Sequence, residues 1–164
     1  MPDELELKQQ RLTARLRDLP SLAVAFSGGV DSTLLLSVAL EVLGPQVMAI
    51  TVDSPLQSRR EIREARDLAR RLGAAHTVLT PPVMELEALQ HNPPDRCYAC
   101  KRLLFTAMRA AMEPLGLAHL THGATCDDLG DHRPGLAAAR EMGVLAPLVE
   151  AGLIETTGVV VDGA

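Results

Sequence analysis

The sequence contains almost no aromatic residues: tryptophan is absent, and aromatic side chains make up only 2% of the 164 residues. The hydrophobic share is nevertheless 47%. The core must therefore be built from Leu, Val, Ala, Ile and Met, a composition that suits helices packed against a parallel sheet. This length and apolar share fit one compact domain rather than two independent ones.

The chain also lacks an excess of positive charge. Its net charge is −5, and Lys and Arg are scattered among Asp and Glu. This balance argues against nucleic acid as a partner, because duplex binding needs a broad basic surface, but it allows a small anionic ligand. No apolar run reaches the roughly 18 residues that cross a bilayer, and the polar N-terminus does not have the layout of a signal peptide. We expect a cytoplasmic protein without a membrane partner.

Cysteines are few. The three in the chain are an odd number and too few for a disulfide framework. Cys97 and Cys100 form a Cys-x-x-Cys pair, which is compatible with half of a zinc site, a redox pair or two incidental thiols. The pair therefore marks a candidate metal or sulfur site.

Short apolar runs alternate with helical spacings along the chain. Residues 22–26 form a continuous apolar run, typical of a strand buried on both faces, whereas Ile62, Ala65 and Ala69 recur at helical spacing. The pattern predicts strands at residues 22–26, 47–52, 75–79, 119–122 and 144–148. Helices are expected near residues 5–19, 32–43, 62–72, 101–111 and 136–142, with a short helical piece between residues 82 and 92.

This alternation implies an α/β fold with a parallel sheet and right-handed crossovers. We expect one domain over residues 1–150, with a five-stranded parallel sheet flanked by helices, and an irregular tail over residues 151–164. In such sheets ligands bind beyond the carboxyl ends of the strands. The loops after Phe26, Val52 and His122 should therefore share one rim.

The loop at residues 27–32, Ser-Gly-Gly-Val-Asp-Ser, lies between a predicted buried strand and a helix. Two glycines permit close backbone approach, hydroxyls stand at both ends, and the helix presents its positive end. No Gly-Lys-Ser/Thr follows, so this is not the lysine-containing P-loop. We expect the loop to hold the pyrophosphate part of ATP. Asp31 suggests a Mg²⁺ ligand, although a tight turn with a helix-starting aspartate is the simpler alternative.

This loop resembles the PP-loop of the ATP pyrophosphatase superfamily, whose members cleave ATP between the α and β phosphates. The resemblance implies a Rossmann-like domain of the adenine nucleotide alpha hydrolase-like type, with ATP and Mg²⁺ as ligands. It also implies an adenosine-binding role for Asp53 and Ser54, although a strand-ending turn explains these two almost as well. The candidate nucleotide-binding residues are Ser27, Gly28, Gly29, Val30, Asp31, Ser32, Asp53, Ser54 and Gly123.

A second polar loop, residues 123–135, gathers three carboxylates and an arginine at the same predicted rim. Mg²⁺ prefers a few carboxylates together with phosphate oxygens, and a cation can balance charge on a transferring phosphoryl group. A solvated acidic turn is the alternative, but the position after the fourth strand favours a function. The catalytic candidates are Asp31, Asp128 and Asp131 as Mg²⁺ ligands and Arg133 and Lys101 as cations.

Together with Arg-Cys-Tyr-Ala-Cys-Lys and Asp-Asp-Leu-Gly-Asp-His-Arg-Pro-Gly-Leu, the PP-loop makes the chain similar to the LarE family of ATP-dependent sacrificial sulfur transferases. That resemblance implies adenylation of a pyridinium carboxylate mononucleotide with release of pyrophosphate, followed by sulfur insertion, in a homo-oligomer. It also implies that Cys97 and Cys100 are two ligands of an iron-sulfur cluster. Members of the family continue for about another hundred residues, so the sequence matches only their nucleotide-binding part.

Three further interpretations stay open. The acceptor of the adenylate could be a nitrogen nucleophile, as in amidotransferases and NAD synthetases, or a tRNA base. The Cys-x-x-Cys pair argues against the first, and the weak basicity of the chain argues against the second. The chain could also be a catalytically incomplete ATP-binding module. Single histidines such as His76 are expected to be ordinary structural residues.

Overall fold

The computed structural model describes residues 2–55, 57–81, 96–124 and 134–153. Within these residues a parallel sheet of four strands has the order β3-β2-β1-β4. The strands are β1 (Leu22–Ala25), β2 (Val47–Val52), β3 (Ala75–Leu79) and β4 (His119–Thr121). The predicted α/β fold with a parallel sheet is therefore confirmed, with β1 in its centre.

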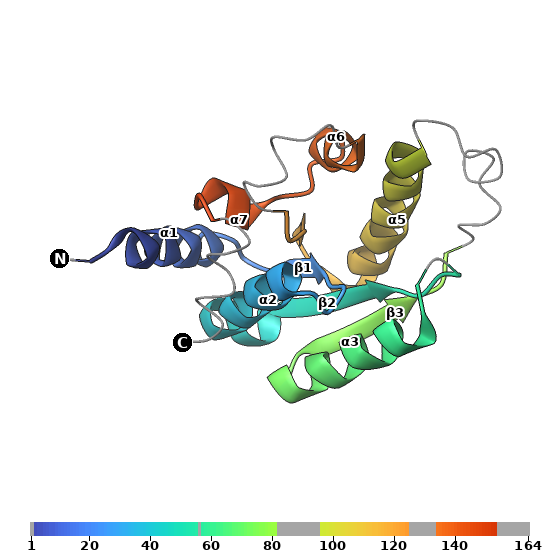
Figure 1. Ribbon diagram of the computed structural model, residues 1–164, viewed down its shortest axis with the longest axis horizontal. Coiled ribbons are helices and arrows are strands. Elements are labelled where there is room, and N and C mark those ends of the chain that lie inside the picture. The colour runs from blue at the N-terminus through green and yellow to red at the C-terminus, as the bar shows by residue number, and fades with distance from the viewer. Residues whose placement is uncertain (1, 56, 82–95, 125–133, 154–164) are drawn as a thin grey trace.

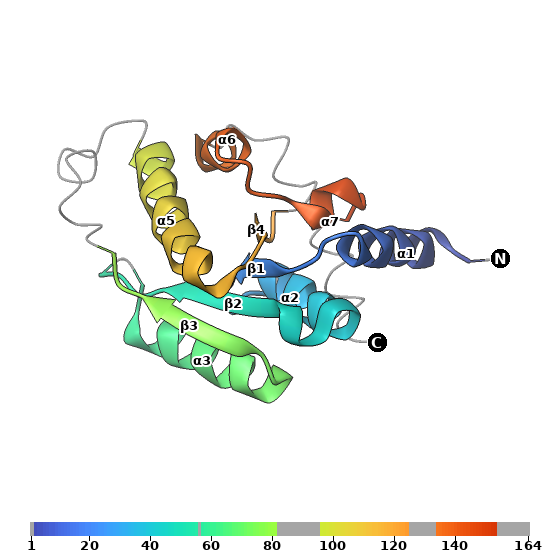
Figure 2. The ribbon, with the colours of Figure 1, turned by 180° about the vertical axis from the view of Figure 1, so that it is seen from behind.

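Six α-helices surround this sheet in the described part of the chain. They are α1 (Glu4–Arg17), α2 (Val30–Leu43), α3 (Arg59–Leu72), α5 (Arg96–Met112), α6 (Pro134–Glu141) and α7 (Pro147–Glu150). Two short 3-10 turns, at Gly44–Gln46 and Glu113–Leu115, follow α2 and α5. Figures 1 and 2 show α2 and α3 on one face of the sheet and α5 and α6 on the other.

Local sequence signals begin and end the helices. Asp3 and Glu6 form a reciprocal capping box at the start of α1, and Ser58 and Glu61 do the same for α3. Gly73 ends α3 in the left-handed conformation, at a φ of 74°. These signals set the first residue of α1 and both ends of α3.

The core consists of two apolar clusters, one on each face of the sheet. The first joins α1, α2 and α3 to the sheet and includes the fully buried Leu16, Leu35 and Leu148. The second joins α5 and α6 to it, through Phe105 and Ala139 among others. Leu153 is also buried in the first cluster, so the packed part of the chain extends past residue 150.

The predicted fifth strand at residues 144–148 is wrong. Leu145 makes a single parallel bridge to Thr121, and its N–H donates to the Leu120 carbonyl at 2.9 Å. Pro147 then starts α7 instead of extending the strand. Proline has no N–H to donate to a sheet and is well suited to the first turn of a helix.

The helix expected from residue 101 also differs in detail. It begins at Arg96, and its fully buried positions are Phe105, Met108 and Met112, whereas Ala107 and Ala111 are only half-buried. The helical piece expected between residues 82 and 92 and most of the predicted tail lie outside the described residues, as do Asp128, Asp131 and Arg133. Among the described helices, none has the length and apolar character to cross a membrane.

Candidate active site

The loop at residues 27–32 joins the carboxyl end of β1 to the start of α2. Phe26, which comes directly after β1, still pairs with β2 because its N–H donates to the Ile50 carbonyl at 2.8 Å. The chain then turns at Gly28, whose φ of 85° favours glycine. A Cβ there would also lie 3.4 Å from the Cα of Ala65 on α3, so the turn packs closely against a neighbouring helix.

The start of α2 combines a helix end with two hydroxyls. Its N-cap is Gly29, which contributes no side-chain hydrogen bond, so the helix end keeps the partial positive charge that attracts anions. The Ser27 and Ser32 hydroxyl oxygens lie 3.3 Å apart, and Ser32 Oγ accepts from the Ser27 N–H at 3.3 Å. Ser27 Oγ in turn accepts from the Gly29 N–H at 3.3 Å. These hydrogen bonds hold the loop in a compact polar turn at the N-terminal end of α2.

This turn opens into a cavity of about 990 Å³, at the upper end of the range found for small-molecule sites. Apolar and polar side chains from the sheet, α3, α5 and α6 line it together with the loop. The lining residues outside the loop are Ala25, Phe26, Ile50, Thr51, Val52, Gln57, Glu61, Ile62, Glu64, Lys101, Leu104, Phe105, Met108, His122, Gly123, Ala124 and Leu136. The rim predicted from parallel-sheet topology thus coincides with a cavity that can hold a nucleotide.

One wall of the cavity comes from α5 and carries a cation. Lys101 Nζ lies 6.0 Å from the centre of the Phe105 ring, a cation–π arrangement. The Phe105 ring packs edge-to-face against His122, with 6.0 Å between the ring centres. The neighbouring Arg102 is outside the lining and is occupied by Glu141 of α6. Among the α5 cations whose side chains are described, Lys101 is therefore the one that lines the cavity together with the phosphate loop.

The opposite wall, from α3, carries two carboxylates that already have partners. Glu61 accepts from the Ser58 N–H at 3.0 Å as part of the helix cap. Glu64 accepts from Arg60 at 2.8 Å. Their negative charge is therefore partly balanced by the helix end and by Arg60, which reduces repulsion of a phosphate nearby.

Gly123 closes the site from the side of β4. A Cβ on this residue would lie 2.9 Å from the Ser32 backbone nitrogen and 3.1 Å from the Ser32 Cα. Real side chains essentially never approach a backbone this closely. Only glycine therefore lets the strand-end loop rest on the first turn of α2.

Asp53 and Ser54 lie at the carboxyl end of β2, but their side chains do not line the cavity. Asp53 forms a two-point ion pair with Arg59, whose hydrogen bond lowers the pKa of the Asp53 carboxyl. Ser54 Oγ donates to Gln57 Oε1 at 2.5 Å. Both side chains are thus engaged in shaping the turn that leads into α3, and an adenosine contact would have to use their backbone or displace these partners.

Asp31 lines the cavity from the first turn of α2, where a carboxylate can accompany phosphate oxygens in binding Mg²⁺. Within the described residues there is no group of three or more His, Cys, Asp and Glu side chains arranged to hold a metal by themselves. Cys97 and Cys100 lie in the first turns of α5, four and one residues before Lys101, and Cys100 is half-buried. The side chain of Cys97 is outside the described part.

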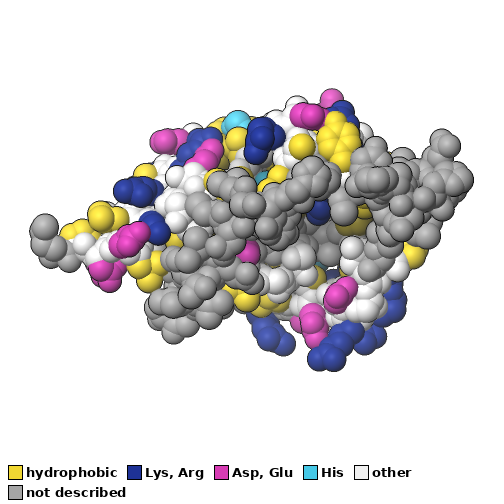
Figure 3. Space-filling view, turned by 45° about the horizontal axis from the view of Figure 1, so that its top comes forward, with side chains coloured by type: hydrophobic (Ala, Val, Ile, Leu, Met, Phe, Trp, Pro, Cys, Tyr) yellow, Lys and Arg dark blue, Asp and Glu magenta, His cyan; other side chains and the backbone are white. Residues whose placement is uncertain are grey.

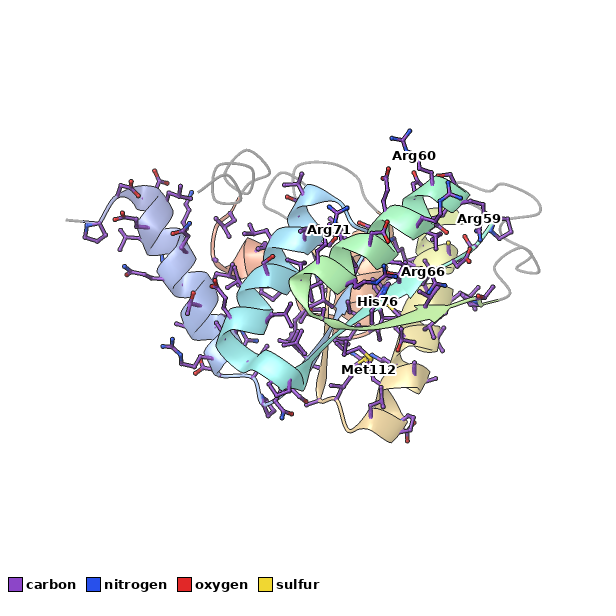
Figure 4. The ribbon with its side chains drawn as sticks, turned by 90° about the horizontal axis from the view of Figure 1, so that it is seen from below. Arg59, Arg60, Arg66, Arg71, His76 and Met112 are labelled. Atoms are coloured by element: carbon purple, nitrogen blue, oxygen red, sulfur yellow. The ribbon has the colours of Figure 1, made fainter. Side chains whose placement is uncertain are left out.

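Two residues for which the sequence predicts no role at the site, Thr51 and His76, are linked by hydrogen bonds to Phe26, the residue before the loop. Thr51 of β2 is 3% exposed and lines the cavity, and His76 of β3 is hydrogen-bonded to it. Figure 4 shows His76 together with Arg66 between β3 and α3. Burial, and then the charge of Arg66, lower the pKa of His76. A threonine in a buried strand gives no sequence signal that its hydroxyl will bond to the residue before a phosphate loop.

Residues 6–126 match the protein-family model of asparagine synthase. The chain belongs to the asparagine synthase family. This is a family of PP-loop domains, which confirms the superfamily predicted from the loop at residues 27–32. The chain is therefore an ATP-binding domain of this superfamily, and the cavity in front of the loop offers space for the nucleotide.

A similar curated protein is pyridinium-3,5-bisthiocarboxylic acid mononucleotide synthase of Lactiplantibacillus plantarum. It is 37% identical over 153 residues, which are 93% of this chain and 55% of that protein. The chain spans about half the length of the curated relatives that it matches first. The PP-loop domain of this chain thus corresponds to one part of a longer relative.

Solved structures confirm the fold. The glutamine-dependent NAD⁺ synthetase of Acinetobacter baumannii, in complex with ADP, superposes with a TM-score of 0.74 at 18% identity, over 96% of this chain and 32% of that one. The tRNA thiolase NcsA of Methanococcus maripaludis, with its 4Fe-4S cluster, gives a TM-score of 0.69 at 18% identity, over 95% and 62%. At this identity the likeness establishes the Rossmann-like PP-loop fold.

Proposed function

We propose that this chain is the ATP-binding and adenylating part of a sulfur transferase that acts on a pyridinium carboxylate mononucleotide. The observation that carries the proposal is the cavity in which the PP-loop, Asp31 and Lys101 come together. The similarity to a pyridinium-bisthiocarboxylate mononucleotide synthase over 93% of the chain supports this substrate class. We further propose residues 1–150 as the PP-loop domain, with Leu153 of the following segment packed against its core.

The proposed chemistry starts with the substrate carboxylate. One of its oxygens attacks the α-phosphorus of ATP, the bond from this phosphorus to the bridging oxygen breaks, and pyrophosphate leaves. The acyl adenylate then has AMP as a good leaving group, which a sulfur donor displaces to give the thiocarboxylate. No protein nucleophile is needed for adenylation, because positioning and charge stabilisation lower the barrier.

The described residues suit this reaction. The Ser27–Ser32 hydroxyl pair and the end of α2 would hold the pyrophosphate, and Asp31 would share a Mg²⁺ with its oxygens. Lys101 faces the same space and would balance charge that moves onto the leaving group. The apolar wall with Phe105 offers a place for the adenine base. Asp128, Asp131 and Arg133 are proposed to complete the metal and phosphate contacts.

For the sulfur step we propose Cys97 and Cys100 as two ligands of a metal centre. Both cysteines precede Lys101 by no more than four residues in α5. Because we propose that Lys101 balances charge on the leaving group, this spacing supports a role for the pair close to the acyl adenylate. The thiolase neighbour carries a 4Fe-4S cluster, and a cluster of that kind needs ligands beyond these two cysteines. Iron or zinc content of the purified protein, compared with that of a Cys97→Ser, Cys100→Ser variant, tests this assignment.

Pyrophosphate release is the direct test of the function. The protein is incubated with ATP and Mg²⁺, with or without pyridinium-3,5-biscarboxylic acid mononucleotide, and the same nucleotide as its amide is the control. Pyrophosphate formation that requires the carboxylate supports the proposal. ATP binding without substrate-dependent pyrophosphate would contradict it and identify an ATP-binding module.

A nitrogen acceptor is the second candidate, because the family model is that of an amide-forming synthase. The two are separated by adding either ammonia or sulfide after adenylation. An amide product would favour the nitrogen acceptor, and a thiocarboxylate would favour sulfur transfer.

Figure 3 shows acidic and basic side chains interspersed over one face of the molecule, which favours a small-molecule substrate over tRNA. Self-association and a cytoplasmic location stay predictions.

A further inference from the structure

The hydroxyl of Thr51 lies between the phosphate loop and the edge strand β3. Thr51 Oγ1 is 2.7 Å from the carbonyl oxygen of Phe26 and 2.7 Å from Nε2 of His76. Phe26 is the residue that immediately precedes the loop, and it is 2% exposed. The contact therefore joins β3, through β2, to the point where β1 becomes the loop.

The direction of these hydrogen bonds follows from the groups involved. A hydroxyl has one proton, and a carbonyl oxygen can only accept. Thr51 must therefore donate to Phe26, and its oxygen is left to accept a hydrogen bond from the N–H of His76. This requires His76 to carry a proton on Nε2. The rings of Phe26 and His76 also pack edge-to-face, with 6.1 Å between their centres and 88° between their planes. This packing limits rotation of the imidazole.

The peptide group between Phe26 and Ser27 is held at both of its polar atoms. Its oxygen accepts from Thr51, and its N–H, which belongs to Ser27, donates to Ser32 Oγ at 3.3 Å. Because the peptide group is planar, these two contacts fix its orientation. The same orientation determines where the loop leaves the sheet and where the Ser27 and Ser32 hydroxyls stand.

We propose that His76 and Thr51 form a positioning pair that sets the phosphate loop for nucleotide binding. His76 directs the Thr51 hydroxyl, Thr51 orients the Phe26–Ser27 peptide, and that peptide places the hydroxyl pair at the start of α2. Neither residue needs to touch the phosphates of the nucleotide to act in this way. This proposal rests on the proposed function, since it takes the loop as the ATP phosphate site.

A matched control exists on the other side of β1. Thr121 of β4 is also fully buried, and its Oγ1 donates to the Ala23 carbonyl at 2.9 Å. The change Thr121→Val removes the same kind of hydrogen bond to the same strand, three residues before Phe26. It should lower stability as Thr51→Val does, without altering the loop.

The experiment measures the dissociation constant of ATP with Mg²⁺ by titration calorimetry and the unfolding midpoint Tm of each variant. Thr51→Val is expected to weaken ATP binding about tenfold, which corresponds to the loss of one hydrogen bond and leaves the Phe26 carbonyl without the Thr51 donor. Thr51→Ser restores the hydroxyl and should restore affinity. His76→Leu should weaken binding in the same direction, and His76→Gln, which keeps a donor near Nε2, should recover most of it.

Two results would overturn the inference. One is wild-type affinity in folded Thr51→Val, and the other is an equal loss of affinity in Thr121→Val. If Thr51→Val does not fold, the comparison of His76→Leu with His76→Gln decides, because equal affinities in that pair would remove the role of His76. Failure of the wild-type protein itself to bind ATP would instead refute the proposed function.

Discussion

Replacing Gly123 by alanine perturbs the candidate site at a defined point. The new Cβ would lie 2.9 Å from the Ser32 nitrogen, 3.1 Å from the Ser32 Cα and 3.2 Å from the Asp31 carbonyl carbon. Favourable contacts between carbon atoms begin at about 3.5 Å. All three neighbours are backbone atoms and cannot rotate away, so the first turn of α2 or the loop after β4 must shift by about 0.5 Å.

The size of the effect follows from this forced shift. Overpacking of a buried site costs about 1–3 kcal/mol, which for a domain of this size lowers Tm by about 3–10 °C. The shift also moves Ser32, whose hydroxyl belongs to the phosphate loop. Hydrogen bonds to charged groups are worth about 1.5–3 kcal/mol, so misplacing one of them should weaken ATP binding by about 10- to 100-fold.

The assay compares Gly123→Ala with Gly44→Ala by calorimetric titration of ATP and by thermal unfolding. Gly44 lies at the other end of α2 with a φ of 58°, and a Cβ added there would meet no atom within 4 Å. The ψ of Gly44 is −123°, outside the left-handed helical region, so alanine there should cost about 1–3 kcal/mol of backbone strain. This control should therefore lower Tm and leave ATP affinity unchanged. Wild-type affinity in Gly123→Ala, or an equal loss in both variants, would refute the steric argument.

Three further outcomes are expected. Asp31→Asn should weaken ATP binding at least tenfold with Mg²⁺ present and little with EDTA; an equal effect in both would leave Asp31 as a helix-start residue worth about 0.3–1 kcal/mol. Lys101→Met should slow pyrophosphate release about tenfold, whereas Arg102→Met should not, because Arg102 is bound to Glu141; rate measurements of the two variants test this. The pKa of His76 is lowered in the folded protein, so the unfolded chain binds a proton at this residue more readily. The contribution of neutral His76 to the free energy of unfolding is therefore complete above about pH 6.5 and declines as pH falls toward the folded pKa. Urea midpoints measured from pH 8 to 5 should decline less in His76→Gln.

The sheet and the phosphate loop were predictable from sequence because their signals are local. The two inner strands, β1 and β2, are short and largely apolar runs. The loop follows the first of these runs directly, with Ser27 after Phe26 and then two glycines. Parallel topology then places strand ends on one rim. The cavity lies at that rim and includes Lys101, which stands directly after the Cys-x-x-Cys pair in the sequence.

The prediction of a fifth strand was wrong because an apolar run can form either a strand or part of a helix. Residues 144–148 are apolar enough for a buried strand, but Leu145 alone meets β4, and Pro147 turns the chain into α7. The proline is visible in the sequence and carries the correct signal. Its missing N–H outweighs the apolar character of the run, because a strand paired in the sheet needs that donor.

The side chains of Asp53 and Ser54 show a second limit. Their place at the end of β2 was predictable, but their side chains are held by Arg59 and Gln57, only a few residues further along the chain. An aspartate before a helix that starts with arginine can find its partner locally. Position on the rim therefore does not by itself direct a side chain into the cavity.

The phosphate loop depends on more than its own six residues. Gly28 rests on Ala65 of α3, Gly123 rests on the first turn of α2, and the Phe26 carbonyl is held by Thr51. These contacts come from three elements far apart in the sequence, and each is made with backbone atoms of the loop or its neighbours. The hexapeptide supplies the groups that can bind phosphate, whereas the surrounding fold determines where they stand. A residue such as His76 therefore has no motif of its own, because its role exists only once β3 lies beside β2.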